Sequence, residues 1–338
     1  MKVLYAIQGT GNGHLSRARD VIPALQKHCE LEIIVSGTQS EVKLPYPVKA
    51  QYKGMSFLYN KKGGLDYPKT ISHNLNLKAW KEINSIPVEE YDVVINDFEP
   101  ISAWACKRKG VTSIGMGHQA SFWSKKTPRP SKRDPLGEFV LQNYAPADYG
   151  IGFHFERYDE FIYTPVVRSD VRNLQPSNEG HYTVYLPAFN EEVLLKYLNK
   201  VPDTTWHVFS KFTKEPYQIG NVEVNPVNNE GFMKSFAGAA GILTGAGFET
   251  PAETLYLGKK LFAVPIKGQY EQYCNAVSLE KMGIPVLWKV SDAFVEKLTK
   301  WVKEGEPLQV DYPDNIQEVV DEMFARINDG TFQLNKRR

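Results

Sequence analysis

Residues 2–35, "KVLYAIQGTGNGHLSRARDVIPALQKHCELEIIV", carry the pattern that decides the fold. Two short apolar runs, 3–7 and 31–35, enclose a glycine-rich stretch and a helical pattern near 14–28. Short apolar runs bounded by glycine and polar residues are typical of buried strands, and a helix between two of them is typical of a βαβ unit. The stretch therefore predicts right-handed βαβ units in a parallel sheet.

The same alternation continues on both sides of a break in the middle of the chain. Further strands and helices are predicted at 92–96, 100–109 and 112–116, and then at 182–186, 190–199, 206–210, 241–245, 250–257, 261–265 and 271–282. The stretch 163–180 is rich in proline and polar residues and has no apolar periodicity, which is typical of an interdomain connection. We expect an α/β protein with two domains, 1–165 and 181–312, a linker at 166–180, and a C-terminal helical region, 313–338, that could pack back on the N-terminal domain.

The composition excludes several classes of protein. The 40 basic and 39 acidic residues nearly cancel, so there is no overall positive charge of the kind that binds nucleic acid. Cys29, Cys106 and Cys274 are far apart and form no CxxC pair, so neither a zinc site nor a disulfide framework is predicted. The chain starts on a strand and has no apolar run near the roughly 18 residues of a membrane span. We expect a cytoplasmic protein, with peripheral contact at the inner face of the membrane left open.

The first glycine-rich loop contains Gly9, Gly11, Asn12 and Gly13, and it ends at His14. A helix that starts after such a loop presents unpaired backbone N–H groups and a positive dipole end, which suits an anionic ligand. The dinucleotide pattern GxGxxG fails because its third glycine would fall at His14, and strand 31–35 ends in "VSGT" without an acidic residue. The P-loop pattern is absent as well. The loop therefore favours a ligand that approaches the backbone, and it argues against NAD.

His14 stands at the entrance of this helix. The helix dipole disfavours a protonated imidazole there, which keeps the ring available as a base near neutral pH. The structural alternative is that His14 only caps the helix or packs against it. His14 would lie at the carboxyl edge of a parallel sheet, where ligands bind, so the interpretation as a base and the structural interpretation carry similar weight.

A second glycine motif, "LTGAGFETPAETLYLGKKLFAVP", covers 243–265. Gly245 and Gly247 precede a helix with Pro251 in its first turn, and Thr250 and Glu253 have the spacing of a capping box. Glu253 could therefore serve as a helix cap and have no other role. The functional alternative is a glycine turn and helix start that hold a diphosphate, with the carboxylate accepting from ribose hydroxyls.

A third motif, "GQYEQYCNA" at 268–276, follows a predicted strand. Glu271, Gln272 and Asn275 would lie at the carboxyl edge of the sheet, where side chains face the ligand crevice. Glutamine and glutamate offer the donors and acceptors that match paired sugar hydroxyls. A solvated helix start is the alternative.

Together, "TGAGFETPAE" (244–253), "LGKKLFAVP" (257–265) and "GQYEQYCNAVSLEKMG" (268–283) resemble the nucleotide-sugar-binding half of GT-B glycosyltransferases. The resemblance is to the group that contains the N-acetylglucosaminyltransferase that makes lipid II, and "GTGNGHLSRA" is similar to its first loop. It implies two Rossmann-like domains facing across a cleft, with the acceptor on the N-terminal domain. It also implies that Gly247 lies under the diphosphate, that Glu253 binds the ribose, and that Glu271 and Gln272 bind the donor sugar. The implied donor site is Gly245, Ala246, Gly247, Phe248, Thr250, Glu253, Glu271, Gln272 and Asn275.

Two departures from that group leave the substrates open. Glu271-Gln272 stands where the group has two glutamines, which leaves the donor sugar open. Leu-Ser-Arg follows Gly-His where proline is usual, which leaves the acceptor open.

The resemblance implies an inverting transfer of a hexosyl or N-acetylhexosaminyl group from a nucleoside diphosphate sugar, with uridine the expected nucleotide, to a hydroxyl acceptor. His14 is the first candidate base, and Asp97 is the second or orients the histidine. The chain contains no Asp-x-Asp, so no metal or other cofactor is expected. A nucleotide-sugar 2-epimerase of the same fold and a non-catalytic nucleotide-sugar-binding protein are the alternatives.

A basic loop at 124–135 follows Phe122 and Trp123. Its cations are Lys125, Lys126, Arg129, Lys132 and Arg133. They form either a solvated loop or a contact for an anionic acceptor or lipid headgroup, since clustered cations near an anionic membrane contribute roughly 1 kcal/mol each.

Overall fold

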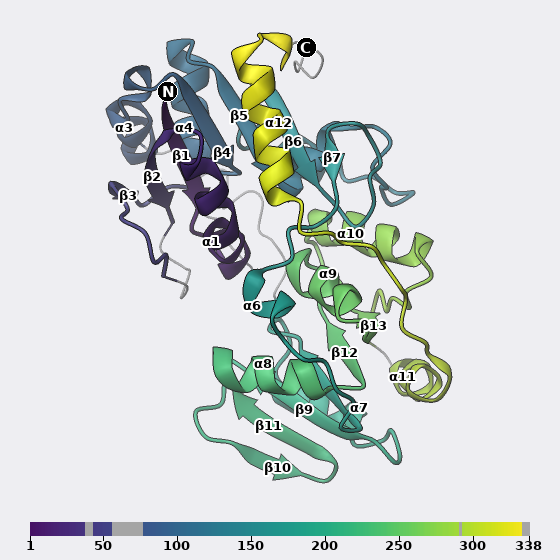
Figure 1. The fold of residues 1–338 in the computed structure, drawn as a ribbon. Coiled ribbons are helices and arrows are strands. Elements are labelled where there is room, and N and C mark those ends of the chain that lie inside the picture. Colours follow the sequence, from purple (N-terminus) through teal and green to yellow (C-terminus); the bar gives the residue numbers. More distant parts are fainter. Residues whose placement is uncertain (38–42, 56–76, 291–292, 333–338) are drawn as a thin grey trace.

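The computed structural model describes residues 1–37, 43–55, 77–290 and 293–332. Two α/β domains lie end to end, with the N-terminal domain in purple to teal and the C-terminal domain in green (Figure 1). In the described part of the chain, no helix is long and apolar enough to cross a membrane.

The N-terminal domain is built on a seven-stranded sheet in the order β3-β2-β1-β4-β5-β6-β7, and every pairing in it is parallel. The strands are β1 Lys2–Gln8, β2 Glu30–Ser36, β3 Ala50–Tyr52, β4 Val93–Asp97, β5 Ser113–Gly117, β6 Tyr149–Phe153 and β7 Ile162–Tyr163. Its helices are α1 Asn12–Gln26, α3 Leu77–Ser85, α4 Pro100–Lys109 and α5 Pro135–Asn143, with 3-10 turns η1 Val88–Glu90 and η2 His118–Trp123. β1 and β4 are buried almost throughout, as expected for central strands covered on both faces.

The C-terminal domain has a six-stranded sheet in the order β10-β11-β9-β8-β12-β13, in which only β10 is antiparallel to its neighbour. The strands are β8 His181–Tyr185, β9 Thr205–Ser210, β10 Tyr217–Ile219, β11 Val222–Pro226, β12 Gly241–Thr244 and β13 Lys260–Ala263. The helices are α7 Glu191–Leu198, α8 Asn229–Gly238, α9 Glu249–Tyr256, α10 Tyr270–Lys281 and α11 Ala293–Glu304.

The two domains are connected twice. The segment after β7 contains a short helix, α6 Ser169–Arg172, and leads into β8. The last helix, α12 Ile316–Asn328, returns to the N-terminal domain and packs against α1 (Figure 1). There His28 stacks on Phe324 with ring centroids 4.7 Å apart, and its Nε2 lies 2.6 Å from Oδ1 of Asp321. Residues 333–338 of the C-terminal region lie outside the described part.

The predicted α/β class is confirmed, and the predicted elements match the observed ones within about two residues. The helix expected at 14–28 spans 12–26, because it begins directly after Gly11, whose φ of 104° ends the strand-to-helix turn. Several elements have no counterpart in the prediction: β3, β6, β7, β10, β11, α5, α6, α8 and α11. The position of the site depends on two sheet edges. The carboxyl ends of β1 and β4 are neighbours in one sheet, as are those of β8, β12 and β13 in the other.

Candidate active site

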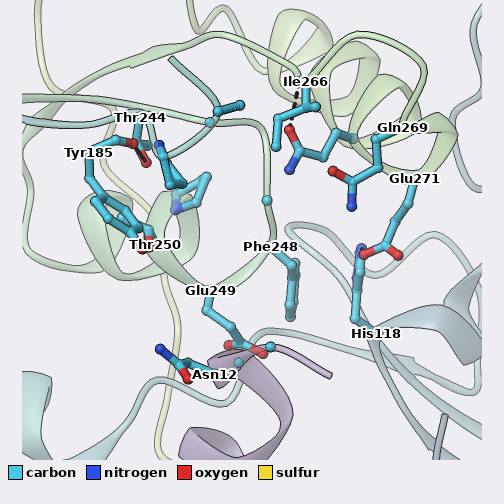
Figure 2. A pocket seen from close by; sticks show the side chains of 18 of the residues that line it. Asn12, His118, Tyr185, Thr244, Phe248, Glu249, Thr250, Ile266, Gln269 and Glu271 are labelled. Atoms are coloured by element: carbon cyan, nitrogen blue, oxygen red, sulfur yellow. Dashed lines mark hydrogen bonds and ion pairs between the residues drawn. The ribbon is translucent and has the colours of Figure 1, made fainter. Parts of the chain in front are cut away.

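A cavity of about 380 Å³ lies between the two sheet edges. The N-terminal domain lines it with the loop after β1, the start of α1, and side chains that follow β4 and β5. The C-terminal domain lines it with the loop after β8, the start of α9 and the start of α10. Figure 2 shows Glu249 extending towards Asn12, with Gln269 and Glu271 on the side nearer His118. The cavity therefore presents groups from both domains to one ligand volume.

His14 is held by a buried carboxylate. Its Nδ1 lies 2.8 Å from Oδ1 of Asp97, which has no solvent exposure, while 14% of the histidine side chain is exposed. When Nδ1 carries the proton and donates it to Asp97, Nε2 keeps its lone pair. This arrangement can present an oriented neutral imidazole to a substrate.

Arg17, next to His14, makes hydrogen bonds to both domains. Its Nη2 donates to both Asp97 oxygens at 2.7 and 2.8 Å, and its Nη1 donates to Glu249 of α9. Burial alone would raise the pKa of Asp97, but Arg17 and His14 hold that pKa below the usual carboxyl range. Asp97 therefore stays ionised and can accept a hydrogen bond from the His14 ring.

Glu249 shows the opposite shift. Burial raises its pKa to about 7, and the neighbouring Glu253 adds to the shift, while Arg17 opposes it. The carboxyl group is therefore partly protonated at neutral pH, at the helix start that faces the cavity.

This shift predicts a pH-dependent stability. Because the folded protein binds the Glu249 proton more tightly than the unfolded chain does, its unfolding free energy should fall as the pH rises from 4.5 to about 7. Across that window, the unfolding free energy of wild type should therefore fall by on the order of 2–3 kcal/mol relative to that of Glu249→Gln. Denaturant unfolding at pH 5, 6, 7 and 8 measures this difference. Glu192→Gln, in the exposed first turn of α7, should follow the wild-type profile. A gap between wild type and Glu249→Gln that is constant with pH would show that Glu249 is ionised throughout.

The start of α9 differs from the predicted capping box. The helix begins at Glu249 after Phe248, and no side chain of the described residues caps it. Glu253 does not reach back to Thr250. Instead it pairs with Arg168 of the linker through two hydrogen bonds, one of them 2.8 Å long, and it is 2% exposed. The open backbone N–H groups and the positive dipole end of α9 therefore face the cavity and suit an anion.

The two glycines before α9 leave room for such a ligand. A Cβ at Gly247 would have no atom of the described residues within 4 Å, and one at Gly245 would be 3.6 Å from Oε1 of Gln272. Both glycines line the cavity. A ligand can therefore approach the backbone of this turn closely.

A polar wall lies at the start of α10. Nε2 of Gln119, from η2, donates to the Glu271 carboxylate at 3.2 and 3.3 Å, and burial raises the pKa of Glu271. Oε1 of Gln272 accepts from the Ile266 N–H at 2.9 Å, which turns its amide nitrogen away from that contact. Oε1 atoms of Gln119 and Gln269 are buried without a hydrogen-bond partner among the described residues. Unpaired carbonyl oxygens of this kind favour a ligand that brings hydroxyl donors.

His118 closes the wall between the domains. Its ring stacks on Phe248 at 3.9 Å, its Nδ1 lies 2.9 Å from the Phe153 carbonyl oxygen, and its Nε2 lies 2.9 Å from Oδ1 of Asn275. Burial lowers the pKa of His118 to about 3, so the ring is neutral. Its packing suits a structural contact that fixes Phe248.

The structure brings most of the predicted site residues to one cavity. Those that line it are Gly11, Asn12, Gly13, His14, Gly245, Gly247, Phe248, Thr250, Glu271 and Gln272. The others lie behind this lining. Gly9 donates its N–H to Ser36, and the buried Ala246 accepts from Asn275 at 3.2 Å. Asp97 is hydrogen-bonded to His14, and Glu253 is paired with Arg168.

Sequence reasoning missed Gln8, Arg17, Phe98, Gln119 and Glu249. Arg17 had a readable signal, since residues three apart on a helix share a face and His14 was already a candidate. Gln8 ends β1 and Phe98 follows β4, at positions where ligand-facing side chains are common. Nothing local in the sequence indicates that Gln119 would meet Glu271, because 152 residues separate them.

The basic loop is only partly solvated. Arg129 is turned inward, where it bonds Glu138 at 2.8 Å and the Phe122 carbonyl at 2.7 Å. Lys125, Lys126, Lys132 and Arg133 are exposed. Contact with an anionic lipid surface stays a prediction for these four side chains. Equal sedimentation with neutral and anionic vesicles would contradict it.

Two α/β domains whose strand ends face one cavity define the GT-B class of fold. Residues 1–304 match the model of the family described as Glycosyl transferase family 1, and the chain belongs to that family. The resemblance stated from the sequence motifs is thereby confirmed, and the protein is a glycosyltransferase.

Solved structures agree on the fold. MurG of Acinetobacter baumannii is 14% identical, with a TM-score of 0.56 over 96% of this chain and 100% of the other. MnaA of S. aureus in complex with UDP is 14% identical, with a TM-score of 0.60 over 97% of each chain. UGT89C1 of Arabidopsis thaliana in complex with UDP is 13% identical, with a TM-score of 0.58 over 97% of this chain and 96% of the other. Among curated protein sequences, none matches significantly.

Proposed function

We propose that the protein transfers a hexosyl or N-acetylhexosaminyl group from a UDP-linked donor to an acceptor hydroxyl, with inversion and without a metal ion. One observation carries this proposal. The cavity sets the oriented histidine of one domain opposite the uncapped helix start and glycine turn of the other. Two of the structural neighbours were solved with UDP, which supports the choice of nucleotide.

The donor would bind along the C-terminal side of the cavity. Its diphosphate would lie at the glycine turn and at the N–H groups of α9, where the helix dipole stabilises the negative charge that develops on departure. Its sugar hydroxyls would donate to the unpaired oxygens of Gln119 and Gln269 and to Glu271. Closure between the domains excludes water, which limits hydrolysis.

The transfer would be a single displacement. The acceptor oxygen forms a bond to the anomeric carbon from the face opposite the diphosphate, as the bond from that carbon to the diphosphate oxygen breaks. The electron pair of the broken bond leaves with UDP, and the acceptor proton passes to Nε2 of His14. Inversion follows because the incoming and leaving oxygens lie on opposite faces.

UDP is expected to stabilise the wild-type protein in thermal denaturation, more than dTDP, GDP or NAD does. A ligand at 100 times its dissociation constant adds about 2.7 kcal/mol when it binds only the folded state, which is several degrees for a protein of this size. Gly247→Asp should abolish the shift by placing a carboxylate in the open space at the glycine turn, whereas Gly247→Asn is the matched neutral control and should retain more of it. Absence of a shift with every nucleoside diphosphate would refute the donor site.

The ribose contact implied for Glu253 is tested in the same assay. Glu253→Ala removes the UDP shift if the carboxylate leaves Arg168 to bind the ribose, and it keeps the shift if Glu253 only anchors the linker.

Transfer should persist in excess EDTA. The described residues contain no group of three or more His, Cys, Asp or Glu side chains suited to hold a metal ion, and the leaving charge is assigned to backbone amides and a helix dipole. The measurement is the rate of UDP release with and without chelator. Complete loss in EDTA that Mg²⁺ or Mn²⁺ restores would contradict metal independence.

A further inference from the structure

Phe98 has a backbone conformation that side chains of its type rarely adopt. Its φ is 54°, and Phe98 and Asp203 are the only non-glycine residues with positive φ in the described part of the chain. This conformation costs about 1–2 kcal/mol and persists only where the surroundings impose it. Phe98 directly follows Asp97, the residue that holds the candidate base.

Hydrogen bonds of the buried residues on either side of Phe98 impose this conformation. Asn96, 1% exposed, accepts from the Glu99 N–H at 3.0 Å and donates to the Glu99 carbonyl at 2.5 Å. The Glu99 carboxylate in turn accepts from the N–H groups of Ile101 and Ser102 at 2.6 and 2.7 Å. Phe98 is thereby held between two fixed residues, and its side chain lines the cavity.

The ring lies beside the candidate base. Its plane is within 11° of the His14 ring at a centroid distance of 6.3 Å, and it packs on Tyr144 at 4.9 Å. An aromatic face in this position offers a flat apolar surface next to the atom that would take the acceptor proton.

Gln8 provides a polar group at the same end of the cavity. It is 1% exposed, and its Nε2 donates to the hydroxyls of Tyr144 at 3.2 Å and Thr10 at 3.0 Å. Tyr144 donates its own proton to the Met55 carbonyl at 2.9 Å, so its oxygen is an acceptor, which fixes the orientation of the Gln8 amide. Oε1 of Gln8 has no hydrogen-bond partner among the described residues, and Gln8 lines the cavity. A buried unpaired carbonyl oxygen is costly unless a ligand donates to it.

We propose that Phe98 and Gln8 form the acceptor subsite, and that the acceptor is a sugar ring. This inference rests on the proposed function. A pyranose has a C–H face that packs on an aromatic ring, and it has a second hydroxyl that can donate to Gln8 while the reacting hydroxyl faces His14. An alkyl alcohol lacks the second hydroxyl, and the polar Gln8, Thr10 and Asn12 do not suit an alkyl chain. In the transfer, the sugar hydroxyl gives its oxygen to the anomeric carbon and its proton to His14, and UDP leaves with the bonding pair.

The test uses the full chain saturated with UDP and saturation-transfer NMR. The probes are the methyl pyranosides of glucose, galactose, mannose and N-acetylglucosamine, with 4-methylumbelliferone and decanol for the other acceptor classes. At least one pyranoside should receive saturation, most strongly at the C–H protons of one ring face. Phe98→Gly removes the ring at a φ that glycine accepts readily, and it should weaken binding about tenfold. Phe98→Tyr should retain binding, and Gln8→Met should weaken it about fivefold.

A control variant and the alternative results separate the acceptor subsite from the proposed function. Phe139→Ala, which removes an aromatic side chain that is 63% exposed and does not line the cavity, is the matched control and should leave pyranoside binding unchanged. If UDP stabilises the protein but no pyranoside binds, or if only 4-methylumbelliferone or decanol binds, the sugar acceptor is refuted and the proposed function stands. Equal pyranoside binding by wild type and Phe98→Gly refutes the role of Phe98. If UDP itself gives no thermal shift, it is the proposed function that fails.

Discussion

His14→Ala should lower kcat for sugar transfer by about 10²–10⁴-fold, the usual contribution of a positioned general base. The reason is geometric. Nδ1 lies 2.8 Å from a carboxylate that is fully buried and held ionised, so the ring has one tautomer available and Nε2 is left to accept a proton. The measurement is UDP release under saturating donor and acceptor, together with the thermal shift produced by UDP, which should not change.

The chain contains its own control for this experiment. His28 lies just beyond the other end of α1 and also faces an aspartate, with Nε2 2.6 Å from Asp321, but that pair is on the surface, away from the cavity. His28→Ala should leave kcat unchanged. If His14→Ala transfers sugar at the wild-type rate, another group is the base. Loss of the UDP shift in His14→Ala would instead make His14 a donor-binding residue.

Elements with local signals were predictable from the sequence. Helix α4 spans Pro100–Lys109 as expected, because Pro100 supplies a first-turn residue with no N–H to satisfy, and Gly110 ends the helix at a φ of 69°. The strand ends around the site were placed for a similar reason, since apolar runs of four to six residues next to glycine indicate buried parallel strands.

Contacts between distant parts of the chain were not predictable. The spacing of Thr250 and Glu253 indicates a capping box, but Arg168 lies 85 residues before Glu253 and pairs with its carboxylate. The cluster of His14, Arg17, Asp97 and Glu249 likewise requires two helices from different domains to meet. Local pattern therefore identified the motifs, whereas domain docking decided which of their side chains face the cavity.

Arg17→Ala should destabilise the protein by about 3–5 kcal/mol, because removing one partner of a buried ion pair leaves the other charge uncompensated. Arg17 is 2% exposed, and its guanidinium contacts both the buried Asp97 and Glu249 of the other domain.

Arg19→Ala is the matched control on the same helix. Arg19 and Asp170 are 41% and 46% exposed, so losing that pair should cost about 0–1 kcal/mol. Urea unfolding measures both, and similar values would show that the buried cluster adds nothing beyond a surface pair. Activity should fall as well, since Arg17 holds both oxygens of the Asp97 carboxylate, and without that contact the carboxylate no longer fixes the position of the His14 ring. Arg17→Lys should restore part of the stability but not the transfer rate, because one ammonium cannot reproduce the fork that contacts both Asp97 and Glu249.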